Sequence, residues 1–377
     1  MRVVVSGYVG KKITGIGRNL ICLLNGLESR NEYIIYVNKD MEKEFRFFGS
    51  NITVKTYNIS KNSSLKNLFW TTFIFPIKVL VENADKALIP NFTLLLFKFR
   101  PTIVIMHDLI EFNVSNKFSK KKMFYRTKLA DPITARRADK IITVSENSKR
   151  DIVKFLHIPE EKISVIYNGV DQKKFQHMDE TEAFRILDKK GWPHNFLLYA
   201  GTIDHPGKNA MALIKVFEQL KEENLFLGKL VLAGMPGAGY EVVESYVNQS
   251  KCRDNIVFTG YVTDEELIAL YSTCRLFCFL SLYEGFGIPP LEALACGAKV
   301  LVSNTSSLPE VVADIGSTVD PTDIDAIRKA VLSSLQLDCY LETDKRVKEH
   351  LANYDWKNLS EKFEYVIAGE ENEESCN

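Results

Sequence analysis

Short apolar runs rich in β-branched residues alternate with longer segments of helical spacing along almost the whole chain. Such runs are typical of strands buried on both faces of a sheet, and their alternation with helices predicts parallel α/β architecture. The ten runs are residues 3–5, 33–37, 102–106, 140–144, 163–166, 196–200, 229–233, 255–258, 276–280 and 299–302. Ten units are too many for one doubly wound sheet, so the sequence predicts two Rossmann-like domains.

A polar stretch between residues 169 and 193 interrupts this alternation and marks the predicted domain boundary. The chain has 377 residues, more than one hydrophobic core usually supports. We expect a first domain over residues 1–178 and a second over residues 179–355. Doubly wound domains bind ligands at the carboxyl ends of their strands, so we expect a central cleft lined by the loops after strands.

Charge is distributed unevenly, although the formal net charge is zero with 48 Lys and Arg against 48 Asp and Glu. Residues 1–174 contain 30 basic and 16 acidic residues, a net charge of +14, and the remainder contains 18 and 32, a net charge of −14. This asymmetry predicts an anionic partner for the first half, with nucleic acid, a membrane surface and a phosphorylated ligand all open.

Cysteine usage and apolar patterning predict a cytoplasmic protein. The seven cysteines form no CxxC pair, so we expect reduced core thiols and no zinc site. The N-terminal residues predict a buried strand and not a signal peptide. The longest apolar stretch, residues 68–81, contains Pro76 and Lys78 and is shorter than the roughly 20 residues that span a bilayer. We therefore expect at most peripheral membrane contact, and a disordered acidic tail over 370–377.

Three segments before the densest motif contain candidate ligand groups. Gly15 and Gly17 open an amphipathic helix, where backbone amides can approach a phosphate, although a tight turn explains them equally well. His107 follows a strand and can donate to a sugar hydroxyl or hold a phosphate, although a lone histidine is more often structural. Lys208 lies near the start of a predicted helix, where it could neutralise a diphosphate or simply be a solvated surface lysine.

The densest motif runs from Ser281 to Gly297 and contains two glutamates. Glu284 follows a buried strand and precedes a Gly-Phe-Gly turn. Proline suits a first helical position, so Pro289 or Pro290 places Glu292 in the first turn of a helix. Two carboxylates at one end of a cleft can hold hydroxyl groups of a sugar and a ribose. Compensation of the helix dipole explains Glu292 without a ligand but does not explain Glu284.

These residues resemble those of family 4 glycosyltransferases of the GT-B fold. Glu284 and Glu292 form the E-x7-E pattern of EGFGIPPLEALACG, and residues 144–152 (VSENSKRDI) and 165–171 (VIYNGVD) match further motifs. The resemblance extends from the GIGR loop to residues 354–356. It implies retaining, metal-independent transfer of a hexose from a nucleotide-diphosphate sugar, with no cofactor. It also implies a final helix, from residue 356, that crosses back to the first domain.

The resemblance also assigns roles to residues. His107 and Glu284 would be catalytic, contacting the transferred hexose or the reaction centre. Donor binding would fall to Gly15, Gly17, Thr202, Lys208, Phe286, Gly287, Ile288 and Glu292, with Lys208 on the diphosphate and Glu292 on the ribose. Many relatives have an arginine where this chain has Thr202 or Gly207, so the diphosphate charge would fall on Lys208 and on amides, unless Arg18 or another basic group contributes.

A basic segment in the first domain then acquires a predicted partner. Phenylalanine and leucine interleave with its cations, and such a mixture can lie on anionic lipid or approach a lipid-linked acceptor, although a solvated helix face explains it equally well. The cations that we assign to this surface are Lys120, Lys121, Lys122 and Arg126. We expect a glycan acceptor, polyprenyl-diphosphate-linked, and peripheral association with the inner face of the plasma membrane, without nucleic acid.

Two other functions remain open from sequence. A sugar-nucleotide epimerase of the same architecture would need paired acid and base groups, which are not evident. A non-catalytic sugar-binding protein would normally be exported, and no signal peptide is evident. The donor is also open among GDP-mannose, UDP-hexoses and dTDP-rhamnose, with a mannose- or rhamnose-type transfer into a bacterial surface polysaccharide favoured.

Overall fold

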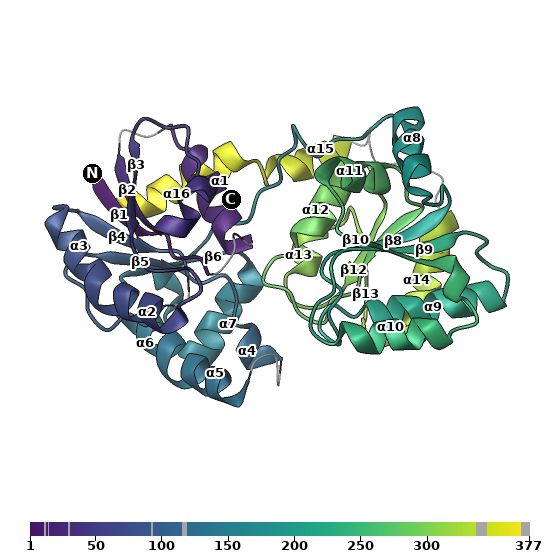
Figure 1. Ribbon diagram of the computed structural model, residues 1–377, viewed down its shortest axis with the longest axis horizontal. Helices are drawn as coiled ribbons and strands as arrows, with labels where there is room; N and C mark the ends of the chain where they lie inside the picture. The colour runs from purple at the N-terminus through teal and green to yellow at the C-terminus, as the bar shows by residue number, and fades with distance from the viewer. Residues whose placement is uncertain are drawn as a thin grey trace. The chain divides into compact units, whose positions relative to one another are not determined.

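The structure, a computed structural model, describes residues 1–10, 13, 15–28, 31–91, 93–114, 119–336 and 345–370 (Figure 1). It divides into two compact units. Unit 1 comprises Met1–Gly169 together with Trp356–Asn377, and unit 2 comprises Val170–Asp355. Each unit contains one sheet in which all pairings are parallel. The predicted α/β class with two Rossmann-like sheets is therefore confirmed.

Unit 1 is built on a seven-stranded sheet in the order β3-β2-β1-β4-β5-β6-β7. The strands are β1 (Arg2–Ser6), β2 (Glu32–Asn38), β3 (Ile52–Tyr57), β4 (Lys86–Ile89), β5 (Thr102–Ile105), β6 (Lys140–Thr143) and β7 (Ile163–Val165). The helical segments are α1 (Gly15–Asn25), η1 (Lys39–Glu44), α2 (Ser64–Phe69), η2 (Trp70–Ile74), α3 (Phe75–Val81), α4 (Ile110–Asn113), α5 (Lys120–Phe124), η3 (Tyr125–Ala130), α6 (Asp131–Arg137), α7 (Glu146–Leu156), η4 (Glu160–Lys162) and α16 (Trp356–Ala368). The sequence prediction missed β3 and β4.

Alternate residues of the central strand β1 divide the core of unit 1 into two layers. Val3 and Val5 pack with leucines of α1 and with Leu359, Phe363 and Ile367 of α16. Val4 packs in the opposite layer, with residues of α3, α6 and α7. Lys86 Nζ donates to the carbonyls of Ile367 (2.6 Å) and Ala368, and thereby caps the carboxyl end of α16. The last helix of the chain is thus part of the core of unit 1.

Unit 2 is built on a six-stranded sheet in the order β10-β9-β8-β11-β12-β13. The strands are β8 (Phe196–Ala200), β9 (Lys229–Ala233), β10 (Ile256–Gly260), β11 (Leu276–Phe279), β12 (Val300–Ser303) and β13 (Ser317–Val319). The helical segments are α8 (Glu180–Lys190), α9 (Ala210–Glu222), α10 (Tyr240–Gln249), η5 (Arg253–Asn255), α11 (Asp264–Thr273), α12 (Ile288–Ala295), α13 (Leu308–Val312), α14 (Ile324–Gln336) and α15 (Lys345–Ala352). The short strand β13 was not predicted.

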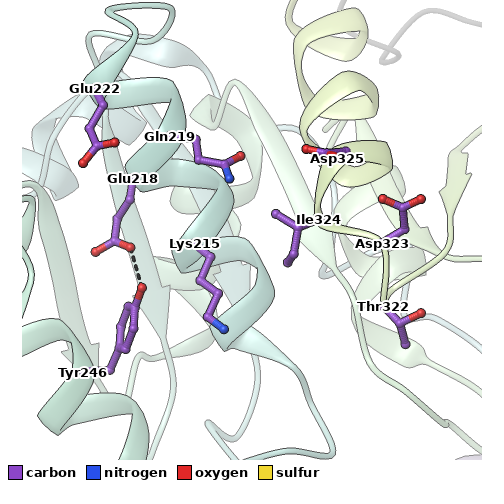
Figure 2. Close-up of a pocket in the computed structure, with 9 residues that line it drawn as sticks. All are labelled: Lys215, Glu218, Gln219, Glu222, Tyr246, Thr322, Asp323, Ile324 and Asp325. Atoms are coloured by element: carbon purple, nitrogen blue, oxygen red, sulfur yellow. Dashed lines mark hydrogen bonds between the residues drawn. The ribbon is translucent and has the colours of Figure 1, made fainter.

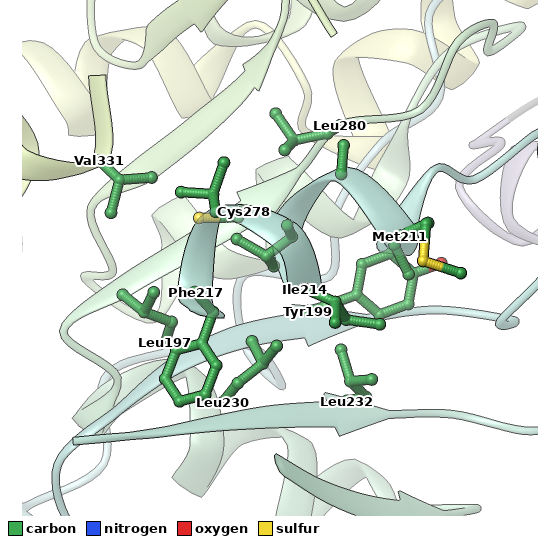
Figure 3. Packing of buried hydrophobic residues seen from close by; sticks show 14 of the residues in the cluster. Leu197, Tyr199, Met211, Ile214, Phe217, Leu230, Leu232, Cys278, Leu280 and Val331 are labelled. Carbon is green, nitrogen blue, oxygen red and sulfur yellow. The ribbon is translucent and has the colours of Figure 1, made fainter. Parts of the chain in front are cut away.

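A large hydrophobic cluster on one face of the unit 2 sheet fixes the strand ends that position the candidate site (Figure 3). Leu197 and Tyr199 of β8 lie against Met211, Ile214 and Phe217 of α9 in this cluster. All five side chains are less than 9% exposed. Close packing of this kind makes the end of β8 and the start of α9 a rigid support for the loop between them.

The segment after Gly169 belongs to unit 2, whereas the sequence prediction kept it in the first domain as far as residue 178. Val170 donates its amide to the carbonyl of Tyr354 at 3.0 Å. His177 Nδ1 lies 3.1 Å from the carbonyl of Cys296, and the Met178 amide donates to Ser272 Oγ at 3.0 Å. Polar side chains led to this segment being interpreted as part of a linker region, but its backbone is bonded to unit 2.

Candidate active site

Lys208 lies in the loop between β8 and α9, two residues before the helix begins. Its amide donates to Asp204 Oδ1 at 3.0 Å, so the loop folds back on itself. The Tyr199 hydroxyl donates to the carbonyl of Thr202 at 2.8 Å and holds the beginning of the same loop, while Thr202 itself is exposed. Burial raises the pKa of Tyr199 above its usual value of 10.0, so this donor remains protonated at neutral pH. The loop is therefore well fixed before any ligand binds.

Lys208 and Glu284 form an ion pair, with 2.5 Å between Lys208 Nζ and Glu284 Oε1. The two side chains are only 28% and 14% exposed, which strengthens their attraction relative to a fully solvated pair. The amide of Leu282 donates to the carbonyl of Gly207 at 2.9 Å, so the backbones of the two loops are also bonded. The structure thus brings together the two charged groups that the sequence analysis took from distant motifs.

The Glu284 loop is held by two serines that the sequence analysis did not single out. Ser306 Oγ accepts from the Glu284 amide at 3.0 Å, and Ser307 Oγ lies 3.0 Å from the carbonyl of Glu284 and 2.6 Å from that of Phe286. Both serines follow β12, at the same edge of the sheet as the other loops. The rule that ligand groups follow strand ends would have found them, because β12 itself was predicted.

Helix α12 begins one residue earlier than the prolines indicated. Gly287 caps the helix with a φ of +105°, and a Cβ atom there would lie 2.6 Å from Leu308 Cδ2. Ile288 is therefore the first helical residue, and Glu292 is the fifth. The prediction that Glu292 lies in the first turn is wrong, because a positive φ is available to glycine and allows the helix to start before Pro289.

Two further donor candidates occupy different environments. Phe286 is 4% exposed, and its ring lies 5.9 Å from that of Tyr354, so its side chain is part of the core of unit 2. Glu292 is half-buried. Burial raises the pKa of the fully buried Tyr271 far above its usual value, and the nearby Glu292 carboxylate raises it further. The phenol beside Glu292 therefore stays protonated at neutral pH.

In unit 1, His107 lies two residues beyond the end of β5 and is 7% exposed. The Ser148 hydroxyl, within the VSENS motif, donates to the His107 carbonyl at 3.1 Å, and Thr143 Oγ1 donates to the preceding carbonyl of Met106 at 2.7 Å. Burial lowers the pKa of His107 from 6.5 to about 4, opposed by a hydrogen bond to the backbone of Pro90. The imidazole is therefore neutral at pH 7.

The neutral imidazole of His107 has a defined polarity. Its Nε2 is buried and has no hydrogen-bond partner among the described residues, so the bond to Pro90 falls to Nδ1. A neutral imidazole carries one proton, and a proton shared with the Pro90 carbonyl leaves Nε2 as an acceptor. The sequence analysis expected a donor to a sugar hydroxyl, whereas this geometry favours an acceptor.

The His107 environment predicts a pH-dependent stability. Because its folded pKa lies below the unfolded value, the unfolded chain binds the extra proton between pH 6.5 and 4, and stability falls as the pH drops through this window. Because of His107, we expect the free energy of unfolding of the wild-type protein to fall by about 2 kcal/mol when the pH drops from 7 to 5. Urea unfolding at the two pH values should show that cost reduced in His107→Gln, and equal losses in both proteins would contradict the assignment.

The glycines at the start of α1 begin a helix and do not form a tight turn. Gly15 is the first helical residue and is exposed, whereas Gly17 is buried. A Cβ atom on Gly17 would lie 3.0 Å from Val9 Cγ2 and 3.1 Å from Ile13 Cγ2, so close packing explains this glycine. The first amides of α1 still lack helical partners and point from the helix end, as an anion site requires.

The basic segment of unit 1 separates into exposed and buried cations. Lys120, Lys121 and Lys122 on α5 are exposed. Arg126 is 11% exposed, with its Nη2 2.8 Å from Glu111 Oε1 and its Nε 3.9 Å from Asp131 Oδ2. Burial, with the neighbouring Glu111, raises the pKa of Asp131 to about 9. Arg126 is thus neutralised within the fold and is not the surface cation expected from sequence.

A cavity of about 730 Å³ in unit 2 lies apart from these residues (Figure 2). It is lined by α9, by Tyr246 of α10 and by residues 322–325 before and within α14. Glu218 accepts from the Tyr246 hydroxyl at 2.7 Å, and acidic side chains predominate on the walls. Such walls repel a nucleotide diphosphate. Within the described ranges no group of three or more His, Cys, Asp or Glu side chains is placed to hold a metal ion.

Comparison with known proteins decides the family. The family model described as Glycosyl transferases group 1 matches residues 179–354, and that described as Glycosyltransferase Family 4 matches residues 13–174. The O-antigen chain mannosyltransferase B of Escherichia coli is 33% identical over 72% of this chain and 71% of its own length. The chain belongs to glycosyltransferase family 4. It is therefore a glycosyltransferase, as the sequence analysis predicted.

Two further comparisons support the same family and fold. The O-antigen chain mannosyltransferase RfbU of Salmonella typhimurium is 27% identical to this glycosyltransferase over 81% of this chain and 80% of its own. Among solved structures, sucrose-phosphate synthase from Thermosynechococcus elongatus aligns with a TM-score of 0.76 over 98% of both chains. Its sequence identity is 16%, so this likeness concerns the GT-B fold alone.

Proposed function

We propose that this glycosyltransferase transfers mannose from a nucleotide-diphosphate donor to a hydroxyl of a lipid-linked glycan, during synthesis of a bacterial surface polysaccharide. The part of this proposal that concerns the donor rests on the Lys208–Glu284 ion pair, which lies in the loops after β8 and β11, whose backbones are hydrogen-bonded to each other. The sugar is supported by two relatives, both named O-antigen chain mannosyltransferases. The resemblance noted from the E-x7-E motif supports retention of configuration and independence from metal.

In the proposed reaction, the bond between the sugar C1 and the diphosphate oxygen breaks, and a bond forms between C1 and the acceptor oxygen. The acceptor proton moves to the departing phosphate on the same face of the sugar. The Lys208 ammonium stabilises the negative charge that develops on the diphosphate, because it is already fixed and partly desolvated. Glu284 then binds hydroxyl groups of the hexose, and Glu292 binds the ribose.

Donor binding requires Lys208 to exchange partners. In the ligand-free structure its ammonium is bonded to Glu284, so an arriving diphosphate competes with this carboxylate. Release of Glu284 makes its oxygens available to sugar hydroxyls, which are neutral and can donate to it. The two events are complementary. A nucleoside diphosphate without sugar is therefore expected to bind less tightly than the complete nucleotide sugar.

A nucleotide panel tests this proposal. We expect GDP to raise the melting temperature more than GMP, because the second phosphate adds the contact with Lys208, and a ligand at about 100 times its Kd stabilises by about 2.7 kcal/mol. UDP and dTDP are the controls for the base. A larger rise in melting temperature with dTDP than with GDP would favour rhamnose over mannose as the transferred sugar. A rise with free sugar alone would favour the binding-protein alternative.

Product analysis completes the test. Incubation with GDP-mannose and a lipid-linked acceptor should release GDP at a rate that EDTA does not change. Interconversion of the nucleotide sugar without release of nucleotide would favour the epimerase alternative. Loss of turnover in EDTA, with recovery on addition of magnesium, would contradict metal-independent transfer.

A further inference from the structure

The helical segment Ser64–Val81 of unit 1 exposes an apolar residue at every fourth position. It runs without interruption through α2, η2 and α3 (Figure 1). The exposed residues are Leu65 (82%), Phe69 (56%), Phe73 (40%), Ile77 (49%) and Val81 (64%). Phe97 and Phe99 of the following loop are exposed by 46% and 49%, and the ring of Phe97 lies 5.6 Å from that of Phe73. We call these seven residues the apolar stripe.

The central π-helical segment helps to keep the stripe on one face. In an α-helix of 3.6 residues per turn, a step of four residues overshoots a full turn by about 40°, so five such positions would spiral around the axis. Segment η2 (Trp70–Ile74) is π-helical, and the amide of Phe75 donates to the carbonyl of Trp70, five residues earlier. This wider turn offsets the drift. Interruptions of this kind occur frequently at functional sites.

The opposite face of the same segment is firmly packed. The Trp70 ring stacks on Tyr57 with centroids 3.9 Å apart, and Phe75 and Val79 are 2% exposed. The segment is therefore apolar on both its inner and outer faces. A surface helix of a water-soluble domain normally presents a polar outer face, and a contiguous exposed apolar patch marks a contact site.

Charges around the stripe indicate what it contacts. Residues 64–81 contain Lys66 and Lys78 and no Asp or Glu, and residues 93–101 contain Arg100 and Lys98, of which Lys98 is paired with Asp139 at 2.7 Å. Glu82, the next residue along the chain, is 13% exposed and paired with Lys55 at 2.7 Å. A cationic rim complements anionic lipid headgroups. A second copy docked face to face would instead bring like charges together.

We propose that the apolar stripe docks unit 1 on an anionic lipid bilayer, with its phenylalanines in the interface and Lys66 and Lys78 at the headgroups. The segment lies in the plane of the interface: its 18 residues contain Pro76 and Lys78, and among the described residues no helix is both long and apolar enough to cross a bilayer. The sequence analysis had assigned membrane contact to Lys120–Lys122. That segment exposes two large apolar side chains, Phe124 (62%) and Leu129 (42%), against the seven of the stripe. The inference does not depend on the proposed donor.

Flotation with vesicles tests the docking surface. The full chain is mixed with vesicles of phosphatidylglycerol and phosphatidylethanolamine, or of phosphatidylcholine alone, and the bound fraction is measured. We expect binding to the anionic vesicles and a drop of about tenfold for each of Phe69→Ser and Phe73→Ser, because each ring loses its burial in the interface. The matched control is Leu225→Ser with Leu227→Ser, at side chains of unit 2 exposed by 48% and 78%.

Each outcome bears on the proposal. Unchanged flotation of the Phe69→Ser, Phe73→Ser protein, or flotation abolished only by Lys120→Ser with Lys121→Ser, would overturn it. So would a dimer in analytical ultracentrifugation that the phenylalanine variants dissociate without any vesicle binding. Folding of each variant is verified by its melting temperature, and donor binding by the GDP-induced shift. A normal shift with lost flotation separates this inference from the proposed reaction.

Discussion

Replacement of Lys208 by alanine should lower kcat/KM for glycosyl transfer by about 10²- to 10³-fold, the usual cost of removing one preorganised group that stabilises developing negative charge. The structure gives a physical reason for this size. The Lys208 ammonium is only partly exposed, its loop is bonded to the Glu284 loop, and Nζ lies 5.4 Å from the centre of the Phe279 ring.

Two measurements make the Lys208 prediction specific. The GDP-induced rise in melting temperature should shrink in Lys208→Ala to about that caused by GMP, because the lost contact is with the second phosphate. The matched control is Lys215→Ala, on α9 at the wall of the acidic cavity, which should retain both activity and the GDP shift. Retained glycosyl transfer by Lys208→Ala would show that this residue has no part in the mechanism. Loss of both transfer and the GDP shift in Lys215→Ala would indicate a general defect of the variants.

The second large effect concerns folding, and arises at the ends of β8 and β9. A Cβ atom on Gly234 would lie 1.9 Å from the carbonyl oxygen of Gly201 and 2.7 Å from its carbonyl carbon. Both contacts are with backbone, so no side chain can move aside, and the φ of +147° at Gly234 disfavours any other residue. We expect Gly234→Ala to lower the free energy of unfolding by about 3 kcal/mol or more.

Gly191 provides a matched control for Gly234. It ends α8 with a φ of +67°, and no atom lies within 4 Å of the position of an added Cβ. Gly191→Ala therefore adds backbone strain without a clash and should cost about 1 kcal/mol. Urea unfolding of both variants measures the difference. Similar losses would mean that the ends of β8 and β9 can separate easily, and that the loops of the candidate site are less rigid than the structure indicates.

The strands that sequence predicted, and those it missed, differ in their surroundings. The ten predicted runs are apolar on successive residues because most lie between two helical layers. Strand β3 lies at an edge of its sheet and has no buried residue, and β13 has three residues, two of them exposed. Strand β4 is buried over its last three residues, but its sequence KALI contains a single β-branched residue. Strands β3 and β13 therefore lack the continuous burial, and β4 the β-branched composition, on which the prediction depended.

The candidate site was predictable where a charged residue followed a predicted strand. Glu284 and Lys208 met this condition, although their direct pairing depends on the neighbour relationship of β8 and β11, which no local pattern contains. Ser306 and Ser307 were not predicted because they are uncharged and act only through hydrogen bonds between their hydroxyl groups and the backbone. The burial of Arg126 could not be predicted from sequence either, because its acidic partners Glu111 and Asp131 lie on different helical segments.

The return of α16 to unit 1 has a consequence for the order of folding during synthesis. Unit 2 is continuous in sequence, whereas unit 1 needs Leu359, Phe363 and Ile367 to cover the helix that begins at Gly15. Domains usually fold as they emerge, the N-terminal one first. Here we expect the later-emerging unit 2 to complete its core before unit 1, which waits with an uncovered apolar face until the last helix leaves the ribosome. A truncation before Trp356 should therefore impair the first unit made, not the last.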